Sequence, residues 1–377
     1  MDKRVHQLII IGNGFDLACG LRSSFSDFFA TRYDKDGNCL LSPDGLTAWD
    51  IILSGIEEDD PLWCDVEGVI AKWVVGDDGH GQLARALGSV FPEEGLFAPR
   101  EELLAAVGDI AKNVDYHLSI IKSRGTYPGN NGKHEEAFEL LLSELHRFER
   151  AFADYLSGQV VSSALDYSRA AERGLTLLAC GSSRSPSGGA LRTPPTSVIN
   201  FNYTWPPYAD PSSRWSNIEV HNVHGSLGSD DIVIGIDGKD IKDDSLALPF
   251  TKTYRLLALE PIEHGSLVHP AGSECPTNCI KFYGHSLAEA DYSYFQSVFD
   301  AVDLYGSDVT LIFYYSGYKD SSGKDIPDEE LRKRQYGMVS HLLTAYGETL
   351  DNSAHGDNLM HKLLLEGRLS IKRLEIV

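Results

Sequence analysis

The sequence predicts an α/β protein with a doubly wound, mainly parallel sheet, which a large helical insertion interrupts after the first strand. Three observations support this fold class. First, Val5–Ile11 has the pattern of a short strand buried on both faces, with the apolar run Leu8–Ile11 ending at a Gly-Asn-Gly turn, as a central strand of a parallel sheet does. Second, apolar residues recur at three- and four-residue intervals across residues 25–174, which indicates helices. Third, strand and helix patterns alternate after residue 197.

The individual elements follow from local patterns. Short apolar runs bounded by turn residues predict further strands over Ser197–Phe201, Ile218–Val223, Asp231–Ile236, Asn278–Tyr283, Val309–Tyr315 and Leu369–Ile376. Helical spacing predicts helices over Ala137–Leu156, Leu287–Val302 and Asp328–Leu350, and turn residues predict loops at 125–132 and 181–197. Residues 1–24 and 175–377 are therefore expected to form a Rossmann-like nucleotide-binding core, and residues 25–174 a helical lobe.

The overall charge argues against several classes of partner. The chain has 33 basic and 55 acidic side chains, a formal net charge of −22, and no block of Lys and Arg. Such a charge repels a phosphate backbone, so nonspecific nucleic-acid binding is not expected, whereas a small nucleotide held by backbone N–H groups is compatible with it. The apolar runs fall well short of the roughly 20 residues of a membrane span, so no membrane partner is expected.

Cysteine usage indicates a cytoplasmic protein. Six cysteines are scattered along the chain, and the N-terminal segment has no signal-peptide pattern, so reduced thiols are expected. A metal site is not expected, because three residues separate Cys275 from Cys279 and there is no second cysteine pair.

Four short segments lie where strands should end, which is where open α/β sheets bind ligands. The first is Gly12-Asn13-Gly14-Phe15-Asp16, whose glycines allow a tight turn and a close backbone approach to a phosphate. A strand-to-helix turn without a ligand is an equally good interpretation, because Leu17 stands where a dinucleotide fingerprint requires its third glycine.

The second segment is Asn200–Thr204. Its asparagine side chains can both donate and accept hydrogen bonds, which suits them to a ribose hydroxyl or to the positioning of a water molecule. The alternative is that these side chains terminate the strand by bonding to their own backbone.

The third segment is His221–Leu227, in which a strand leads to His224 at a Gly-Ser turn. His224 is the best candidate for acid–base chemistry, because an imidazole titrates near neutral pH. A turn histidine that bonds to backbone is the alternative.

The fourth segment, Tyr283–Tyr292, repeats the strand-turn-helix pattern with Gly284, His285 and Ser286 at the turn. Ser286 could contact a sugar or a phosphate, and it is also expected to cap the following helix, with Glu289 completing a capping box. In the helical region, the two acids of Trp63–Glu67 indicate either a crevice-facing cluster or a solvated helix start.

Together these segments resemble the AbiH family of bacterial abortive-infection proteins. The resemblance is carried by Leu8–Leu17, Gly20-Leu21, Ser23–Phe28, Trp63-x-Asp65-x-Glu67, Phe201–Thr204, His221-x-x-His224 with Gly225–Leu227, and Tyr283–Leu287. It spans residues 8–292. It implies a role in phage defence, with an unknown phage trigger, and a homo-oligomer is expected by analogy with other defence proteins.

The order of the motifs is also similar, more distantly, to that of sirtuin-like NAD-binding proteins. This similarity implies that Asn202 positions a water molecule and the ribose, and that His224 is the catalytic histidine. It further implies a dinucleotide site formed by Gly12, Asn13, Gly14, Phe15, Asp16, Thr204, Gly225, Gly284, His285 and Ser286. The four-cysteine zinc ribbon of protein deacylases is missing, so simple hydrolysis is expected instead of deacylation.

The expected activity is therefore hydrolysis of NAD at the nicotinamide–ribose bond, with NAD as substrate and no cofactor required. One rival is a nucleotide-sensing switch without turnover, in which the helical lobe moves when a ligand binds. Another is a hydrolase of a different nucleotide or of nucleic acid.

Overall fold

The computed structural model describes most of the chain. The described residues are 6–54, 65–76, 79–89, 100–113, 131–181, 194–206, 215, 218–228, 231–239, 241–259, 267–270, 272–319 and 323–376. The chain divides into two compact units: Met1–Ser24, Leu156–Ser229 and Ile262–Val377 form the first, and Phe25–Tyr155 and Asp230–Pro261 form the second. The predicted division into a core and a lobe as domains stays a prediction.

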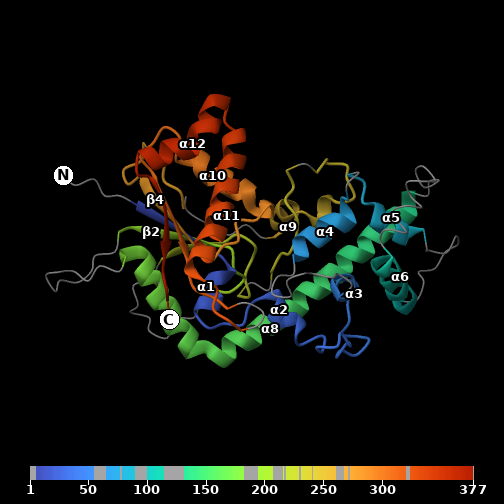
Figure 1. The fold of residues 1–377 in the computed structure, drawn as a ribbon. Coiled ribbons are helices and arrows are strands. Elements are labelled where there is room, and N and C mark those ends of the chain that lie inside the picture. Colours follow the sequence, from blue (N-terminus) through green and yellow to red (C-terminus); the bar gives the residue numbers. More distant parts are fainter. Residues whose placement is uncertain are drawn as a thin grey trace. The chain divides into compact units, whose positions relative to one another are not determined.

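The first unit is built on a six-stranded sheet in which every pair of neighbouring strands is parallel (Figure 1). Its strands are β1 His6–Ile11, β2 Thr196–Asn200, β3 Glu219–Asn222, β4 Thr277–Tyr283, β5 Thr310–Tyr315 and β6 Leu369–Arg373. Their order is β3-β2-β1-β4-β5-β6. This order confirms the predicted doubly wound fold, and it places the topological switch point between β1 and β4.

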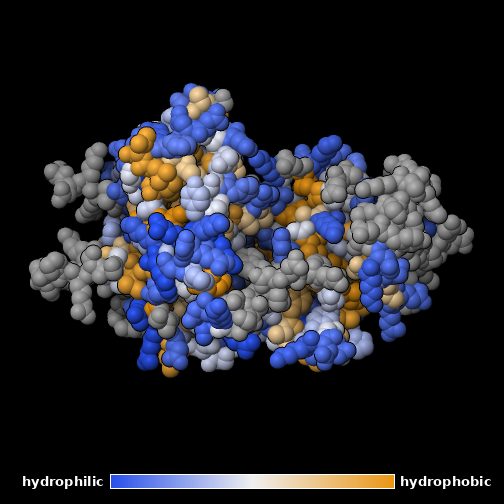
Figure 2. Space-filling model, in the orientation of Figure 1, coloured by the Kyte–Doolittle hydropathy of each residue, from blue (hydrophilic) through white to orange (hydrophobic). Residues whose placement is uncertain are grey.

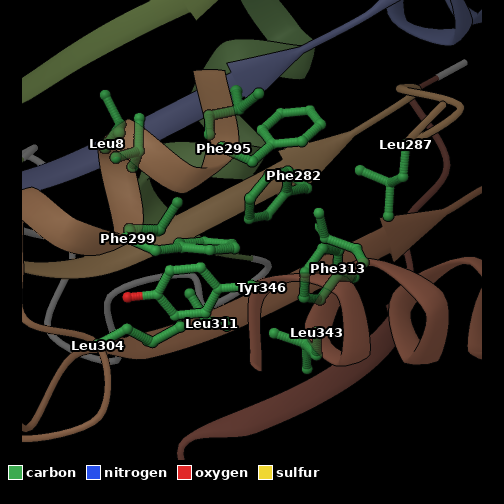
Figure 3. Packing of buried hydrophobic residues seen from close by; sticks show 14 of the residues in the cluster. Leu8, Phe282, Leu287, Phe295, Phe299, Leu304, Leu311, Phe313, Leu343 and Tyr346 are labelled. Atoms are coloured by element: carbon green, nitrogen blue, oxygen red, sulfur yellow. The ribbon is translucent and has the colours of Figure 1, made fainter. Parts of the chain in front are cut away.

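Helices cover both faces of this sheet. They are α1 Asn13–Ala18, the second half of α8 Asn131–Cys180, α10 Tyr292–Ala301, α11 Asp328–Glu348 and α12 Ser353–Leu365. Ile9 and Ile11 of β1 pack with α8, whereas Leu8 and Ile10 belong to the cluster that α10, α11 and α12 complete (Figure 3). Because both faces are buried, Leu8–Ile11 of β1 is a continuous apolar run instead of an alternating one.

Polar contacts fix the end of α8 to the sheet. The buried Lys281 of β4 donates from Nζ to the carbonyl oxygen of Leu178 at 2.6 Å and to Oε1 of Gln7 at 2.8 Å. Gln7 in turn donates from Nε2 to the carbonyl oxygen of Ala179 at 3.2 Å. The last carbonyls of the helix, which have no partner within a helix, are thereby satisfied by two strands.

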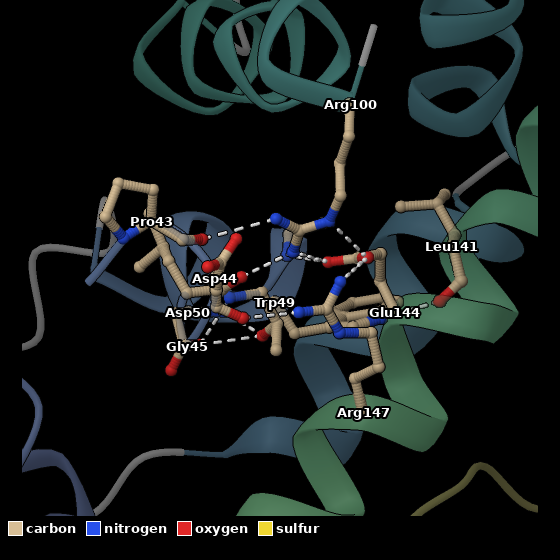
Figure 4. Close-up of polar contacts among 12 residues, drawn as sticks. Pro43, Asp44, Gly45, Trp49, Asp50, Arg100, Leu141, Glu144 and Arg147 are labelled. Atoms are coloured by element: carbon tan, nitrogen blue, oxygen red, sulfur yellow. Dashed lines mark hydrogen bonds and ion pairs between the residues drawn. The ribbon is translucent and has the colours of Figure 1, made fainter. Parts of the chain in front are cut away.

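The second unit is mainly helical. It contains α2 Phe25–Phe29, α3 Ala48–Ser54, α4 Val66–Val74, α5 Gln82–Gly88, α6 Arg100–Lys112, the first half of α8, and α9 Lys252–Ala258. A buried carboxylate of α8 joins three of these helices (Figure 4). Glu144 accepts from the backbone N–H of Ala48 at 2.8 Å and from Nη2 of Arg100 at 3.0 Å, while Trp49 donates to the carbonyl oxygen of Leu141 at 2.8 Å.

The strand predicted over Asp231–Ile236 is wrong. In this segment only Ile236 takes part in a bridge, an isolated one with Thr251. The backbone of Ile234 is paired with side chains instead: its N–H donates to Oε1 of Glu149 at 2.7 Å, and its carbonyl oxygen accepts from Arg255 at 3.0 Å. The apolar side chains here are buried, but Glu149 and Arg255 make the backbone hydrogen bonds that a neighbouring strand would otherwise make.

The surface is mixed in character. Figure 2 shows a face on which hydrophilic and hydrophobic residues are interspersed. Exposed large apolar side chains are spread over several elements, for example Val161 on α8 and Leu365 on α12, and some exposed apolar surface is normal for a protein. Among the described helices, none is long and apolar enough to cross a membrane.

Candidate functional site

The turns that follow β1 and β4 are in direct contact at the switch point. Gly12 donates its N–H to the carbonyl oxygen of Tyr283 at 3.1 Å, and Gly14 donates to that of Gly284 at 2.7 Å. A Cβ atom at Gly14 would lie 2.6 Å from Cα of Gly284, and a Cβ atom at Gly12 would lie 2.7 Å from Cα of His285. Close packing of the two turns therefore requires these glycines, whether or not a phosphate is bound.

This packing leaves a small part of the first turn exposed. The N–H of Phe15 donates to the carbonyl oxygen of Gly12 at 2.8 Å, and the Phe15 ring is fully buried in the core. Asn13 is exposed, and its Oδ1 accepts a hydrogen bond from the hydroxyl of Ser23 at 2.5 Å. Asn13 and the half-buried Gly14 are thus the residues of this turn that a ligand could reach, and their predicted role in binding stays a prediction.

Asp16 lies in the interior and contacts two hydroxyl groups. Its Oδ1 accepts from the Tyr167 hydroxyl at 2.7 Å, and its Oδ2 is hydrogen-bonded to Oγ1 of Thr204. The Tyr167 and Thr204 oxygens lie 3.2 Å apart. Burial raises the pKa of Asp16 to about 7, although both hydroxyls oppose the shift. Three segments far apart in the sequence therefore meet at one carboxyl group.

The end of β2 is held by a network of asparagines. Asn200 donates from Nδ2 to Oδ1 of Asn222 at 2.7 Å and to the carbonyl oxygen of Thr204 at 2.8 Å, and its Oδ1 accepts from the N–H of Asn202 at 3.0 Å. Asn200 thus terminates its strand by bonding to local backbone. This is the second of the two interpretations that the sequence allowed for the Asn200–Thr204 segment. This network fixes the segment that carries Asn202.

The side chain of Asn202 is different. It is buried, with 4% of the residue exposed, and neither Nδ2 nor Oδ1 has a hydrogen-bond partner among the described residues. Buried amides nearly always have partners, and a buried polar group left without one costs about 1–3 kcal/mol. An amide with an open donor and an open acceptor is therefore suited to a ligand or a water molecule.

Next to Asn202, the turn after β3 carries His224. The N–H of Leu227 in this turn donates to the carbonyl oxygen of Tyr203 at 2.9 Å, and the rings of Phe201 and Tyr203 lie 5.3 and 6.4 Å from the His224 ring. The residues on both sides of Asn202 thus contact the His224 turn. The segments that carry the two residues predicted to be catalytic are therefore in contact.

A buried carboxylate joins His224 to the β4 turn. Nε2 of His224 lies 3.1 Å from Oδ1 of Asp291, and Nε2 of His285 lies 3.3 Å from Oδ2 of the same residue. All three side chains are less than a tenth exposed. One aspartate therefore lies against two imidazole rings that come from the turns after different strands.

The proton positions on His285 follow from its partners. Its Nδ1 accepts the N–H of Leu287 at 2.8 Å, so this nitrogen carries no proton, and the neutral ring must be protonated at Nε2, which faces Asp291. Both ring nitrogens of His285 are thus occupied. His285 is therefore a poor candidate for a base.

The β4 turn also stores backbone strain. Leu287 has φ = 54°, in the left-handed region, which costs an ordinary L residue roughly 1–2 kcal/mol. Its side chain is buried in the cluster shown in Figure 3, and this packing holds the strained conformation. Strained residues held in this way are concentrated at functional sites.

The capping box predicted for this turn is wrong. The helix begins at Tyr292, Asp291 occupies its N-cap position without a side-chain cap, and no side chain caps the short 3₁₀ helix at Glu289–Asp291. The helix starts five residues later than the predicted Leu287, because that residue is left-handed. The carboxylate at the cap position binds the two histidines instead of the helix N–H groups.

The remaining candidates lie in different settings. Gly225 has φ = 79° and allows the turn beside His224, and Ser286 is half-buried in the β4 turn. Asp65 caps α4 by accepting the N–H of Gly68 at 2.9 Å, as a residue at a helix start does, whereas Glu67 pairs with the buried Lys252. Trp63 and Cys64 lie outside the described residues. In the part of the chain that the structure describes, no group of three or more His, Cys, Asp or Glu could hold a metal.

Sequence reasoning missed two residues of this site. Asp291 lies within the fourth segment, but an acid just before a helix is usually taken as part of the helix start. Its spacing of six residues from His285 was the available signal. Tyr167 has no local signal, because only the position of α8 on the sheet brings it to Asp16.

Comparisons with known proteins give one match. No curated protein and no solved structure matches the chain. A family model does match: that of the family described as bacteriophage abortive infection AbiH, over residues 8–315. The matched range contains Leu8–Ile11 of β1, all of β2 to β5, and every residue of the site described above. Because the match covers most of the sequence, the chain belongs to the AbiH family.

Proposed function

We propose that this protein acts in abortive infection as an NAD glycohydrolase, which uses water to cleave the nicotinamide–ribose bond. The products are nicotinamide, ADP-ribose and a proton. Family membership supports the role in phage defence. The strand order supports a nucleotide site at the carboxyl ends of the strands near the switch point, where doubly wound sheets bind such ligands.

The observation that carries the proposal is the open amide of Asn202. A ribose hydroxyl is both a donor and an acceptor, so one side-chain amide can bind it with two complementary hydrogen bonds. The amide is buried, in a segment that contacts the His224 turn, and has no partner among the described residues. We assign Asn202 to the ribose that loses nicotinamide, or to the water that replaces it.

His224 is assigned as the base. Cleavage of the glycosidic bond places positive charge on the ribose, in an oxocarbenium-like transition state, and the incoming water or a ribose hydroxyl must lose a proton. An imidazole accepts that proton near neutral pH, and the adjacent Asp291, 3.1 Å away, stabilises the resulting imidazolium. His285 has both nitrogens engaged and serves to orient Asp291.

The phosphates are assigned to the outer side of the first turn. Asn13 is exposed and Gly14 is half-buried, while the other residues of that turn are enclosed by the protein. Ser286, half-buried in the adjacent β4 turn, is assigned to a sugar or phosphate contact. NAD is the substrate in this proposal, and no further cofactor is needed.

The test is NAD consumption by the purified protein, with nicotinamide quantified and with or without lysate from phage-infected cells. Wild type is compared with His224→Ala and Asn202→Ala. His341→Ala is the control, because this histidine is exposed on α11, with 63% of its side chain accessible. We expect NAD loss with matching nicotinamide, abolished by the first two substitutions and retained by the control. Intact NAD in every sample, together with growth arrest on infection, would overturn the hydrolase proposal.

One observation favours a second candidate, a nucleotide-sensing switch without turnover. The N–H groups of Gly12 and Gly14 donate to β4 and its turn, so a ligand that used them would separate the two turns. Binding would then change the structure of the site. Its signature is NAD binding measured by calorimetry without nicotinamide release.

A further inference from the structure

The contacts of Asp16 differ from those of a buried carboxylate. An ionised carboxylate in a protein interior requires a cation or several strong donors. Asp16 is 2% exposed, and none of the described Lys, Arg or His side chains pairs with it. Its contacts are the hydroxyls of Tyr167 and Thr204.

Counting protons distinguishes the two ionisation states. The three groups form a triangle of oxygen contacts: Tyr167 to Asp16, Thr204 to Asp16, and Tyr167 to Thr204 at 3.2 Å. An ionised Asp16 leaves two protons for these three contacts. A protonated Asp16 supplies the third, so that its Oδ2–H donates to Thr204, Thr204 donates to Tyr167, and Tyr167 donates to Oδ1. Only the protonated form closes the ring.

We propose that Asp16 is a positioning residue that is protonated in mildly acidic solution and, in a ring with Thr204 and Tyr167, holds the segment that carries Asn202. The ring joins the β1 turn, the β2 end and α8. Thr204 is two residues from Asn202, and its carbonyl oxygen also accepts from Asn200. Loss of the ring proton would loosen that segment.

The surroundings of Asp16 support this state. Burial raises the pKa of Asp16 to about 7. The other titratable groups that face it are the Tyr167 hydroxyl and the Cys19 thiol at the end of α1. Burial raises the pKa of each, so both stay neutral. A neutral Asp16 also places no negative charge in the turn that the proposed function assigns to phosphates.

The first test does not depend on any activity. Asparagine reproduces a protonated aspartate, because it offers one acceptor and one donor, so Asp16→Asn should fold. The infrared difference spectrum of wild type minus Asp16→Asn at pH 6 should contain the C=O band of a protonated carboxylic acid. A carboxylate band at pH 6 would overturn the proposal. Asp300→Asn is the matched control, because Asp300 also accepts a tyrosine hydroxyl, from Tyr346 at 2.9 Å, but is exposed.

The unfolding midpoint gives a second readout. A folded-state pKa above the unfolded value gives stability that is present in acid and is lost as the pH rises through about 7. The midpoint of Asp16→Asn relative to wild type should therefore rise between pH 5.5 and pH 8.5. That of Asp300→Asn should stay constant over this range. A constant difference for Asp16→Asn would contradict the protonated ring.

The positioning role rests on the proposed function, and its test uses NAD binding followed by calorimetry. If only protein with a protonated Asp16 binds NAD, the apparent Kd rises as the protonated fraction falls. The apparent Kd of the wild type should therefore increase up to about 30-fold from pH 6 to pH 8.5. Asp16→Asn should bind NAD without this pH dependence, and Tyr167→Phe should bind more weakly at both pH values. Wild-type binding that is independent of pH would overturn the positioning role. If the C=O band of the protonated acid is present but neither the wild type nor any variant binds NAD, the proposed substrate is rejected. The protonated ring is retained in that case.

Discussion

Gly14 and Gly284 are in backbone contact across the switch point of the sheet, where the N–H of Gly14 donates to the carbonyl oxygen of Gly284 at 2.7 Å. Neither residue has room for a side chain. A Cβ atom at Gly284 would lie 2.3 Å from the backbone nitrogen of Phe15, and Gly284 also has φ = 68°. The two glycine turns that the sequence predicts as ligand-binding elements are thus also packing partners.

Gly284→Ala should be strongly destabilising. The substitution adds left-handed strain of roughly 1–2 kcal/mol to an overpacking cost of about 1–3 kcal/mol, because the atoms that the new Cβ meets are backbone and cannot move aside. Gly367→Ala is the matched control, since Gly367 has the same φ of 68° with nothing within 4 Å of its Cβ position. Urea unfolding of both variants isolates the contact. Equal losses of stability would show that the turns can separate at little cost.

The sequence predicts the sheet well because both faces of it are buried. Most of β1, Leu8–Ile11, is a continuous apolar run, and the strands found at β2 to β6 fall within the predicted ranges to within one residue at their starts. The order of the strands is set by contacts between distant segments, so no local pattern contains it. The motifs at the strand ends nevertheless indicated which ends would meet.

The errors have a common physical cause. At Asp231–Ile236 the local pattern is that of a strand, but Glu149 and Arg255 satisfy the backbone of Ile234. At Asp291 the local pattern is that of a helix start, but two histidines compete successfully for the carboxylate. In both cases a polar group from a distant segment decides the outcome, and a single sequence gives no indication of it.

Asp291→Asn should remove most of the proposed turnover. Aspartate offers an oxygen to each histidine, whereas asparagine has a single acceptor, so one ring loses its partner and reorients. We expect kcat for NAD to fall about 10²–10⁴-fold with KM little changed, by analogy with other oriented histidine bases. Long-range ¹H–¹⁵N spectra should show His285 protonated at Nε2 in the wild type. An unchanged kcat would exclude Asp291 as the partner of the base.

The ion pair between Glu67 and Lys252 in the second unit should be strongly coupled. Nζ of Lys252 lies 2.8 Å from Oε1 of Glu67, and the lysine side chain is 2% exposed. Glu67→Ala should cost about 3 kcal/mol, because the ammonium stays buried without that carboxylate, and adding Lys252→Met should recover much of the loss. Urea unfolding of the two single variants and the double variant measures the coupling. Additive losses would show that Lys252 does not depend on Glu67.

His6 should make the protein sensitive to acid. Its Nδ1 and Nε2 contact the hydroxyls of Thr277 and Ser197 at 2.9 and 3.0 Å, and its ring stacks on that of His269. Burial, assisted by the His269 charge, lowers the pKa of His6 to about 4. In the unfolded chain, the His6 imidazole therefore takes up a proton near pH 6.5, whereas in the folded protein it stays neutral until the pH falls to about 4. The stability that His6 contributes is present above pH 6.5 and is lost as the pH falls to about 4.

His6→Gln removes this titration and keeps a side chain that can bond to both hydroxyls. In urea unfolding, the wild type should be more stable than the variant at pH 7.5. At pH 4.5 this difference in stability should shrink or reverse. His341→Gln, on the exposed surface, should change the midpoint little at either pH. If the difference between wild type and His6→Gln is the same at both pH values, His6 is charged in the folded protein or does not titrate on unfolding. Its two hydroxyl contacts would then have to be those of an imidazolium, which donates from both nitrogens.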